Sequence, residues 1–205
     1  MKSRPILFTP ENAQKVHDGT KVQTRRIVKP QPKIIHALYG DASLETERIF
    51  RTGDQRIHCP YGTVGDRLWV RESCYISPKD FCDRDDCNWQ DDTGYPRLIS
   101  WSNSDGEAER DYKIKKTPSI FVPKWACRTW LELTEVRVER VQDISVDDAI
   151  AEGAGDWIGE CPLRDTRLCK TQLQFAALWE SIYGDDAWDK NQWVWVLSFR
   201  KIEGD

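Results

Sequence analysis

The segment from 130 to 141 constrains the fold most, because its apolar residues change faces partway along. Leu131 and Leu133 occupy odd positions, whereas Val136 and Val138 occupy even positions. Successive side chains of a strand point to opposite faces, so this slip predicts a β-bulge or a sharp bend between the two pairs. Such a bend is typical of a strongly curved sheet. The segment therefore favours a small curved sheet or barrel over a flat one.

Further short apolar segments are expected to be strands of the same sheet. They lie near Ile6 and at 22–28, 68–70, 120–122 and 193–199. Helices are expected after Thr9, after Ser145 and from 171 to 183, because Thr and Ser can cap a helix start and a glycine follows each segment. Short strands interrupted by helices predict an α+β fold: a small β-barrel flanked by two or three helices, in a single domain spanning 1–205.

The segment from about 77 to 116 differs in composition from the rest of the chain. It is acidic, rich in Asp, Asn, Ser and Gly, and poor in periodic apolar residues. Such a segment has little apolar surface to offset the entropy of ordering it. We therefore expect a long peripheral insertion that does not supply central strands.

Composition limits the setting in which the protein works. The first eight residues contain no stretch like the apolar core of a signal peptide, and no apolar run reaches the roughly 20 residues of a membrane helix. The seven cysteines are odd in number and irregularly spaced, which is typical of reduced thiols. We expect a cytoplasmic protein with no membrane partner.

Charge and aromatic content leave two interpretations open. The net charge of −4 argues against a protein that coats nucleic acid, but residues 15–33 carry six basic side chains against one acidic one. The basic run is either a solvated face or a local nucleic-acid surface, with Arg25 and Lys29 as candidate phosphate contacts. The ten tryptophans can serve either a core or the stacking of bases.

Several segments, taken in order, resemble the ASCH domain. Residues 19–26 resemble its Gly-x-Lys-x-x-Thr-x-Arg signature, and residues 65–72 resemble its Gly-Asp-x-Leu strand. Residues 143–153 are similar to its late helix and residues 193–202 to its last strand. The likeness is greatest to a larger ASCH group often encoded by phages and prophages. The resemblance implies a PUA-like barrel that binds a nucleoside or single-stranded RNA.

A small bacterial member of this family is an N4-acetylcytidine amidohydrolase, and it implies roles for named residues. By position, its Thr, Lys and Glu correspond here to Thr24, Lys21 and Glu152, with Arg26 beside them. A Thr hydroxyl needs a base, and Lys is a base only when its pKa falls well below the ordinary value. Glu152 would then either protonate the leaving cytosine amine or activate the water that hydrolyses an acyl-enzyme. This chain is about twice as long as that enzyme, and the segment from 80 to 116 has no counterpart in it.

The residues themselves allow a simpler alternative. A carboxylate next to Lys21 favours the charged amine, so Lys21 and Glu152 can instead form a structural ion pair, with Thr24 an ordinary strand residue. The chain would then be a non-catalytic module that binds RNA or a modified base.

Three residues of one expected strand are further candidates for binding substrate. Arg71 can bind phosphate or stack on a base, and Glu72 can accept from the exocyclic amine of cytosine. They alternate across a strand, so at most one of them should face a pocket. The alternative for both residues is surface ion pairing. Trp69 is a candidate platform on which a base could stack, and its alternative is a place in the core.

Other chemistries find little support in the sequence. His58, Cys59, Cys74, Cys82 and Cys87 match no common zinc spacing, so we expect no metal. The chain has no P-loop and no Gly-x-Gly-x-x-Gly motif, and we expect no cofactor.

Overall fold

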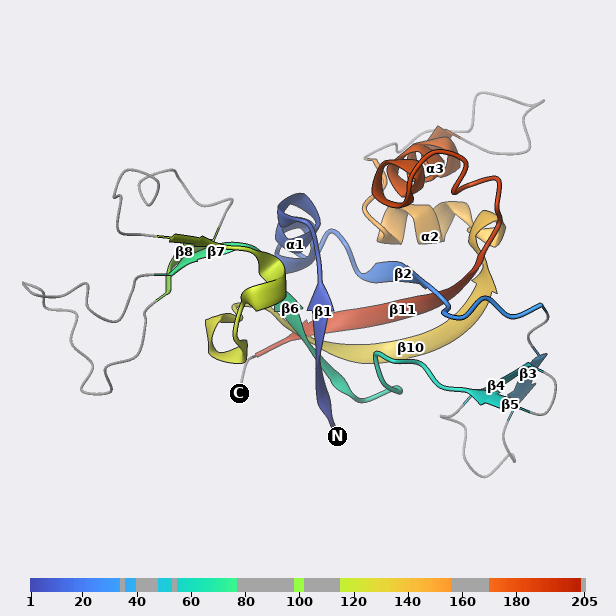
Figure 1. Ribbon diagram of the computed structural model, residues 1–205, viewed down its shortest axis with the longest axis horizontal. Coiled ribbons are helices and arrows are strands. Elements are labelled where there is room, and N and C mark those ends of the chain that lie inside the picture. The colour runs from blue at the N-terminus through green and yellow to red at the C-terminus, as the bar shows by residue number, and fades with distance from the viewer. Residues whose placement is uncertain are drawn as a thin grey trace, which may run out of the picture.

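The computed structural model describes residues 1–33, 36–39, 48–52, 55–76, 98–101, 115–155 and 170–203. Its main sheet has five strands: β1 (Ser3–Leu7), β6 (Arg67–Arg71), β10 (Trp130–Arg140), β11 (Trp193–Ile202) and β2 (Gln23–Ile27), in that order. The sheet is mixed, because β1 runs parallel to β6 while every other neighbouring pair is antiparallel. Its helices are α1 (Pro10–His17), α2 (Val146–Ala151) and α3 (Lys170–Tyr183), and Figure 1 shows α2 and α3 together beyond the β2 edge. The predicted α+β class is confirmed.

The predicted break in the long strand is confirmed. In the β10–β11 pair the register shifts between Leu133 and Glu135, which is the position that the change of parity indicated. The broad curve of β10 and β11 is visible in Figure 1. A bulge bends its strand and increases the local twist, so the sheet is strongly curved.

The sheet nevertheless does not close into the predicted barrel. β1 and β2 form its two edges, and in the described part of the chain they do not pair with each other. A side chain bridges the gap instead, because an Arg26 guanidinium nitrogen (NH2) of β2 donates to the main-chain oxygen of Leu7 in β1 at 2.8 Å. The two edges are therefore close at one end without a ladder of main-chain hydrogen bonds.

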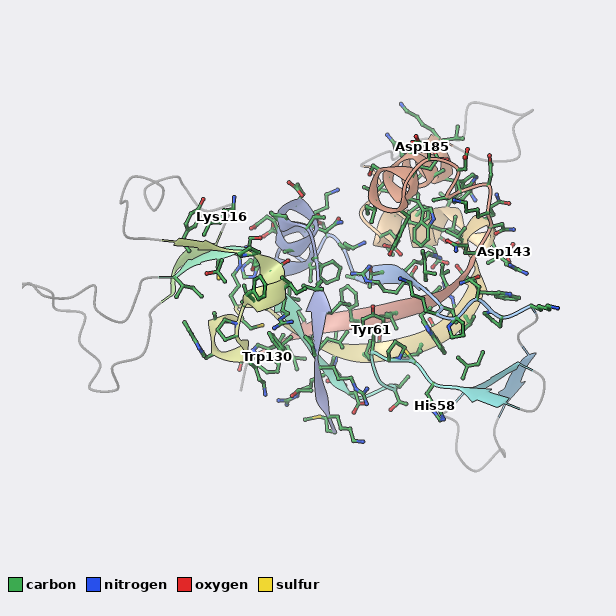
Figure 2. All side chains as sticks on the ribbon, viewed as in Figure 1. His58, Tyr61, Lys116, Trp130, Asp143 and Asp185 are labelled. Carbon is green, nitrogen blue, oxygen red and sulfur yellow. The ribbon has the colours of Figure 1, made fainter. Side chains whose placement is uncertain are left out.

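Apolar residues fill both faces of the sheet, and β11 shows the division clearly. Trp195, Leu197 and Phe199 belong to one cluster, which includes residues of β1, α1 and β6. Tyr61, labelled in Figure 2, packs against this cluster. Val194 and Val196 belong to a second cluster with residues of α2 and α3. A strand covered on both faces reads as a nearly continuous apolar run, as β11 does.

The helix starts follow the expected capping pattern. Thr9 accepts from the Asn12 amide at the start of α1, and Ser145 accepts from the Asp148 amide at the start of α2. Ala13 and Val16 of α1 are buried. Capping side chains satisfy amides that would otherwise have no partner in the first turn.

The strand predicted at 120–122 is wrong. Ser119–Phe121 forms the 3-10 helix η2, followed by a second 3-10 helix, η3 (Lys124–Ala126); a third, η4 (Val141–Asp143), follows β10. Pro118 and Pro123 bracket the segment, and proline cannot donate a ladder hydrogen bond. Ile120 and Phe121 are 57% and 73% exposed, and of the three apolar residues that suggested a strand only Val122 is buried.

Two small sheets lie apart from the main one in Figure 1. The first joins β3 (His36–Tyr39), β4 (Arg48–Thr52) and β5 (Gln55–Ile57), in a region where the sequence shows no sustained period. The second joins β8 (Leu98–Trp101), β7 (Cys74–Ile76) and β9 (Lys115–Thr117). Of the predicted insertion, only β8 and the start of β9 are described; residues 77–97 and 102–114 lie outside the described part. Across the described residues, none of the helices is long and apolar enough to cross a lipid bilayer.

Candidate functional site

Lys21 and Glu152, which are 131 positions apart, form a buried ion pair. Lys21 Nζ lies 2.5 Å from Glu152 Oε2 and donates to the main-chain oxygen of Glu152 at 2.7 Å. Each residue is only 3% exposed. The pair joins the turn after α1 to the end of α2, so it is the contact that the ion-pair alternative predicted.

The main chain brings these two residues together. The Val22 amide donates to the main-chain oxygen of Ala151 at 2.9 Å, which ties the turn after α1 to the last turn of α2. Gly153 then takes φ +74°, a backbone conformation that residues other than glycine adopt only with strain. Its oxygen accepts from Lys15 Nζ at 2.7 Å, so two lysines from the α1 side hold the end of α2.

Arg25 holds the same carboxylate from the other side. One guanidinium nitrogen (NH1) donates to Glu152 Oε1 at 3.1 Å, and the other (NH2) contacts Glu139 at 2.5 Å and Asp148 at 3.1 Å. The Arg25 side chain is completely buried. Arg137 shares both Glu139 and Asp148. Buried charges need such partners, and here one arginine serves three carboxylates.

Thr24 and Arg26 share a face of β2, as the alternation of a strand predicts. An Arg26 guanidinium nitrogen (NH1) donates to Thr24 Oγ1 at 2.7 Å, and the guanidinium lies 5.0 Å from the ring centre of Phe8. The Arg25 guanidinium instead lies 5.6 Å from the ring centre of Phe175 in α3. β2 is the last strand of the sheet, so side chains from both of its faces reach one pocket.

That pocket lies between the N-terminal end of α1, β2 and α3, and has a volume of about 180 Å³. A cavity of about 150 Å³ holds a benzene ring, so this space suits one six-membered ring. Figure 2 shows the side chains that gather around β2 below α2 and α3. The lining residues are Leu7, Phe8, Thr9, Asn12, Lys21, Thr24, Arg25, Arg26, Glu152, Phe175, Leu178, Trp179, Ile182 and Tyr183.

Burial changes the acid–base properties of two pocket residues. Burial lowers the pKa of Lys21 below its ordinary value of 10.5, and the positive charges of Arg26 and Lys15 lower it further, against the opposing effect of Glu152. Burial raises the pKa of the Tyr183 phenol above 10.0. Lys21 is therefore easier to deprotonate than a free lysine, while Tyr183 stays a neutral hydroxyl at neutral pH.

The structure brings together four of the predicted site residues. Lys21, Thr24, Arg26 and Glu152 all line the pocket, although the last is far along the chain from the others. Arg25 also lies there, but it is buried and paired with carboxylates, which makes it unsuitable as a phosphate contact. Arg25 alternates with Thr24 and Arg26 along β2, so its side chain points to the other face of the strand, toward the acidic residues of β10 and α2. Lys29 is exposed and does not line the pocket.

The three candidates on and after β6 do not line this pocket. Glu72 is 3% exposed and forms a bidentate ion pair with Arg128, at 2.6 and 2.9 Å. Arg71 donates from Nε to the Val122 oxygen at 3.0 Å and lies over the ring of Trp69. Trp69 itself is buried. Trp69 therefore lies in the core, as its alternative expected, whereas the ion pair of Glu72 is buried rather than on the surface, and Arg71 bonds to a main-chain oxygen rather than to a carboxylate.

Sequence reasoning missed the aromatic wall and one polar residue. Trp179 and Tyr183 of α3 form a ring pair with centroids 4.3 Å apart, and Asn12 of α1 lies among the lining residues. The apolar residues 175, 178, 179 and 182 lie at helical spacing, which favours a buried face, yet Ile182 is 48% exposed. The apolar face of this helix was the signal available in the sequence. Helical spacing alone cannot distinguish a face that lines an open pocket from a face buried in the core.

The described residues contain no group of three or more His, Cys, Asp or Glu side chains that could hold a metal. Cys82 and Cys87 lie outside the described part of the chain. Cys59, Cys74 and Cys127 are free thiols, and burial raises the pKa of Cys59 and of Cys74 to about 11. Thiols with such values are poor nucleophiles at neutral pH.

Comparisons with known proteins add no neighbour to this description. No protein-family model, no curated protein and no solved structure matches the chain.

Proposed function

We propose that this protein is an ASCH-type, PUA-like nucleoside-handling protein whose pocket hydrolyses N4-acylated cytosine nucleosides. The observation that carries the proposal is the convergence of Lys21, Thr24, Arg26 and Glu152 on one ring-sized pocket. A hydroxyl, an amine with a lowered pKa, a guanidinium and a carboxylate are the groups that acyl transfer requires. An aromatic wall beside them suits a flat base.

The proposed reaction begins at Thr24. The hydroxyl oxygen attacks the acyl carbon of the amide while its proton passes to the neutral amine of Lys21. The C–N bond then breaks, and the leaving cytosine nitrogen takes a proton from Glu152. Water hydrolyses the resulting Thr24 ester, which releases the carboxylic acid and restores the hydroxyl.

The contact between Lys21 and Glu152 supports the first step. At 2.5 Å, a proton can move from the ammonium to the carboxylate, which generates the neutral base and the acid together. Burial favours the neutral amine of Lys21, because desolvation penalises its charged form. Arg26 contributes positive charge next to Thr24 Oγ1, where it stabilises negative charge developing on that oxygen.

A second function is favoured by a different observation. Lys21 and Arg25 together satisfy both carboxylate oxygens of Glu152, and Thr24 Oγ1 accepts from Arg26. A set of polar groups satisfied in this way also suits a rigid site that binds a modified base without reacting. The alternative is therefore a non-catalytic module that binds a base or RNA.

Incubation of the purified protein with N4-acetylcytidine, followed by chromatography, separates the two functions. Release of cytidine and acetate in proportion to the protein, with none from heat-denatured protein, supports the amidohydrolase. Binding of N4-acetylcytidine without release of cytidine supports the binding module. Absence of both turnover and binding rejects a nucleoside function for this pocket.

A further inference from the structure

Most polar side chains in the pocket are already committed to other residues of the protein. Lys21 and Arg25 hold Glu152, and Arg26 holds Thr24 and the Leu7 oxygen. Groups held in this way can take part in a reaction, but they have little free capacity to recognise a ligand. Recognition then depends on polar groups that still lack a partner.

The carboxamide of Asn12 is such a group. Asn12 is half-buried and lines the pocket, and its side chain makes no hydrogen bond to another residue in the described part of the chain. The main-chain amide of Asn12 donates to Thr9 Oγ1, the cap of α1, and this hydrogen bond fixes the main chain at Asn12. Gln14, two residues later, differs, because its amide donates to Asp18 and accepts from Arg128.

A carboxamide is complementary to the edge of a pyrimidine. It offers one acceptor oxygen and one NH₂ donor, and the edge of cytosine presents the N3 acceptor next to the exocyclic N4–H donor. The Trp179 and Tyr183 rings provide a wall against which the face of a base can stack. Edge and face would thus be recognised by different elements, α1 and α3.

We propose that Asn12 is the specificity-determining residue of the pocket and pairs with N3 and N4–H of a cytosine ring. This inference rests on the proposed nucleoside function and names the group that reads the base. Pairing through the NH₂ group requires an acceptor at position 3 of the ring. A ring with C–H in that position leaves the amide donor without a partner.

Calorimetric titration with cytidine and with 3-deazacytidine, in which C–H replaces N3, tests the inference. The wild-type protein should bind cytidine roughly tenfold more tightly, which is the effect of one neutral hydrogen bond. In Asn12→Ala the two ligands should bind equally. Asn12→Asp, which keeps the shape and lacks the donor, should also lose the preference, while Gln14→Ala should retain it.

The outcomes distinguish this inference from the function on which it rests. If the wild type binds cytidine but does not discriminate against 3-deazacytidine, or if Asn12→Ala keeps the tenfold preference, Asn12 does not read the base. Turnover or binding of N4-acetylcytidine by the wild type would leave the proposed function standing in that case. If the wild type binds neither ligand and does not act on N4-acetylcytidine, both proposals are rejected.

Discussion

Lys21 Nζ lies 2.5 Å from Glu152 Oε2, and both side chains are almost completely buried. Two hydrogen bonds hold the segments that carry the pair: the Val22 amide donates to the Ala151 oxygen, and Lys15 Nζ donates to the Gly153 oxygen. A buried ion pair can be structural or can store a proton for chemistry.

Thr24→Ala should abolish hydrolysis of N4-acetylcytidine and leave the fold intact. The substitution removes the proposed nucleophile and the group that Arg26 NH1 contacts, but no apolar core. Thr20→Ala is the matched control, because Thr20 is exposed and its hydroxyl donates to the Lys15 oxygen, away from the pocket. Cytidine release and circular dichroism measure the two effects. Undiminished turnover in Thr24→Ala would exclude Thr24 as the nucleophile.

Glu152→Gln should reduce the turnover rate on the order of 10²-fold or more, because it keeps the shape and removes the proton transfer. It should also destabilise the protein by about 3 kcal/mol, since Lys21 and Arg25 then face a neutral amide in a buried site. Steady-state kinetics and urea unfolding measure the two effects. A loss of stability without any turnover in the wild type is the result expected of a purely structural pair.

The rate should depend on pH through Lys21. Burial, with help from Arg26 and Lys15, lowers the pKa of Lys21 below 10.5. Above that pKa the pair loses the proton that Glu152 must donate, so kcat/KM should fall with rising pH at an inflection below 10.5. Between its folded and unfolded pKa values the unfolded chain binds more protons at Lys21. This residue's contribution to stability should therefore rise with pH across that window.

Lys15→Met tests the electrostatic part of this explanation. Lys15 is exposed and does not line the pocket, but its positive charge lowers the pKa of Lys21. Its removal should move the inflection of the pH–rate profile upward, and added salt should reduce the difference from wild type. Lys29→Met, which removes an exposed charge that does not affect Lys21, should leave the inflection unchanged. A downward movement in Lys15→Met would contradict the assignment to Lys21.

Arg25→Ala should destabilise the protein by about 3–5 kcal/mol, because three carboxylates lose a completely buried partner. Arg200→Ala is the control, since Arg200 pairs with Glu132 at an exposed position and should contribute at most about 1 kcal/mol. Free energies of unfolding in urea measure both variants. Equal effects in the two variants would show that the Arg25 cluster is not a stabilising unit.

Affinity for single-stranded RNA should be weak and sensitive to salt. Because Lys21 and Arg25 are buried, the basic segment has fewer free charges than its sequence suggests, and Lys29 is one that remains exposed. Lys29→Ala should reduce the log–log salt slope by about 0.7, whereas Lys116→Ala, in the separate β8-β7-β9 sheet, should not change it. A salt slope that Lys29→Ala leaves unchanged would remove this segment from any RNA surface.

Local features were largely predictable from the sequence. The bulge near 134, the caps Thr9 and Ser145, and the shared face of Thr24 and Arg26 depend on residues only a few positions apart. Steric and hydrogen-bonding rules act over that range, so parity and capping patterns can be read directly. The strand expected at 120–122 failed because two flanking prolines outweighed its apolar residues.

The candidate site was decided by tertiary packing. Periodicity alone could not pair Lys21 with Glu152, because the two residues are 131 positions apart. It was the family resemblance that suggested that they belong to one site. The burial of Arg25 among Glu139, Asp148 and Glu152 was not foreseen either, because a basic run looks the same whether it faces solvent or carboxylates. The sequence determined which side chains share a face. Only the packing of α2 and α3 against the edge of the sheet determined which of those faces is buried, paired or open to a ligand.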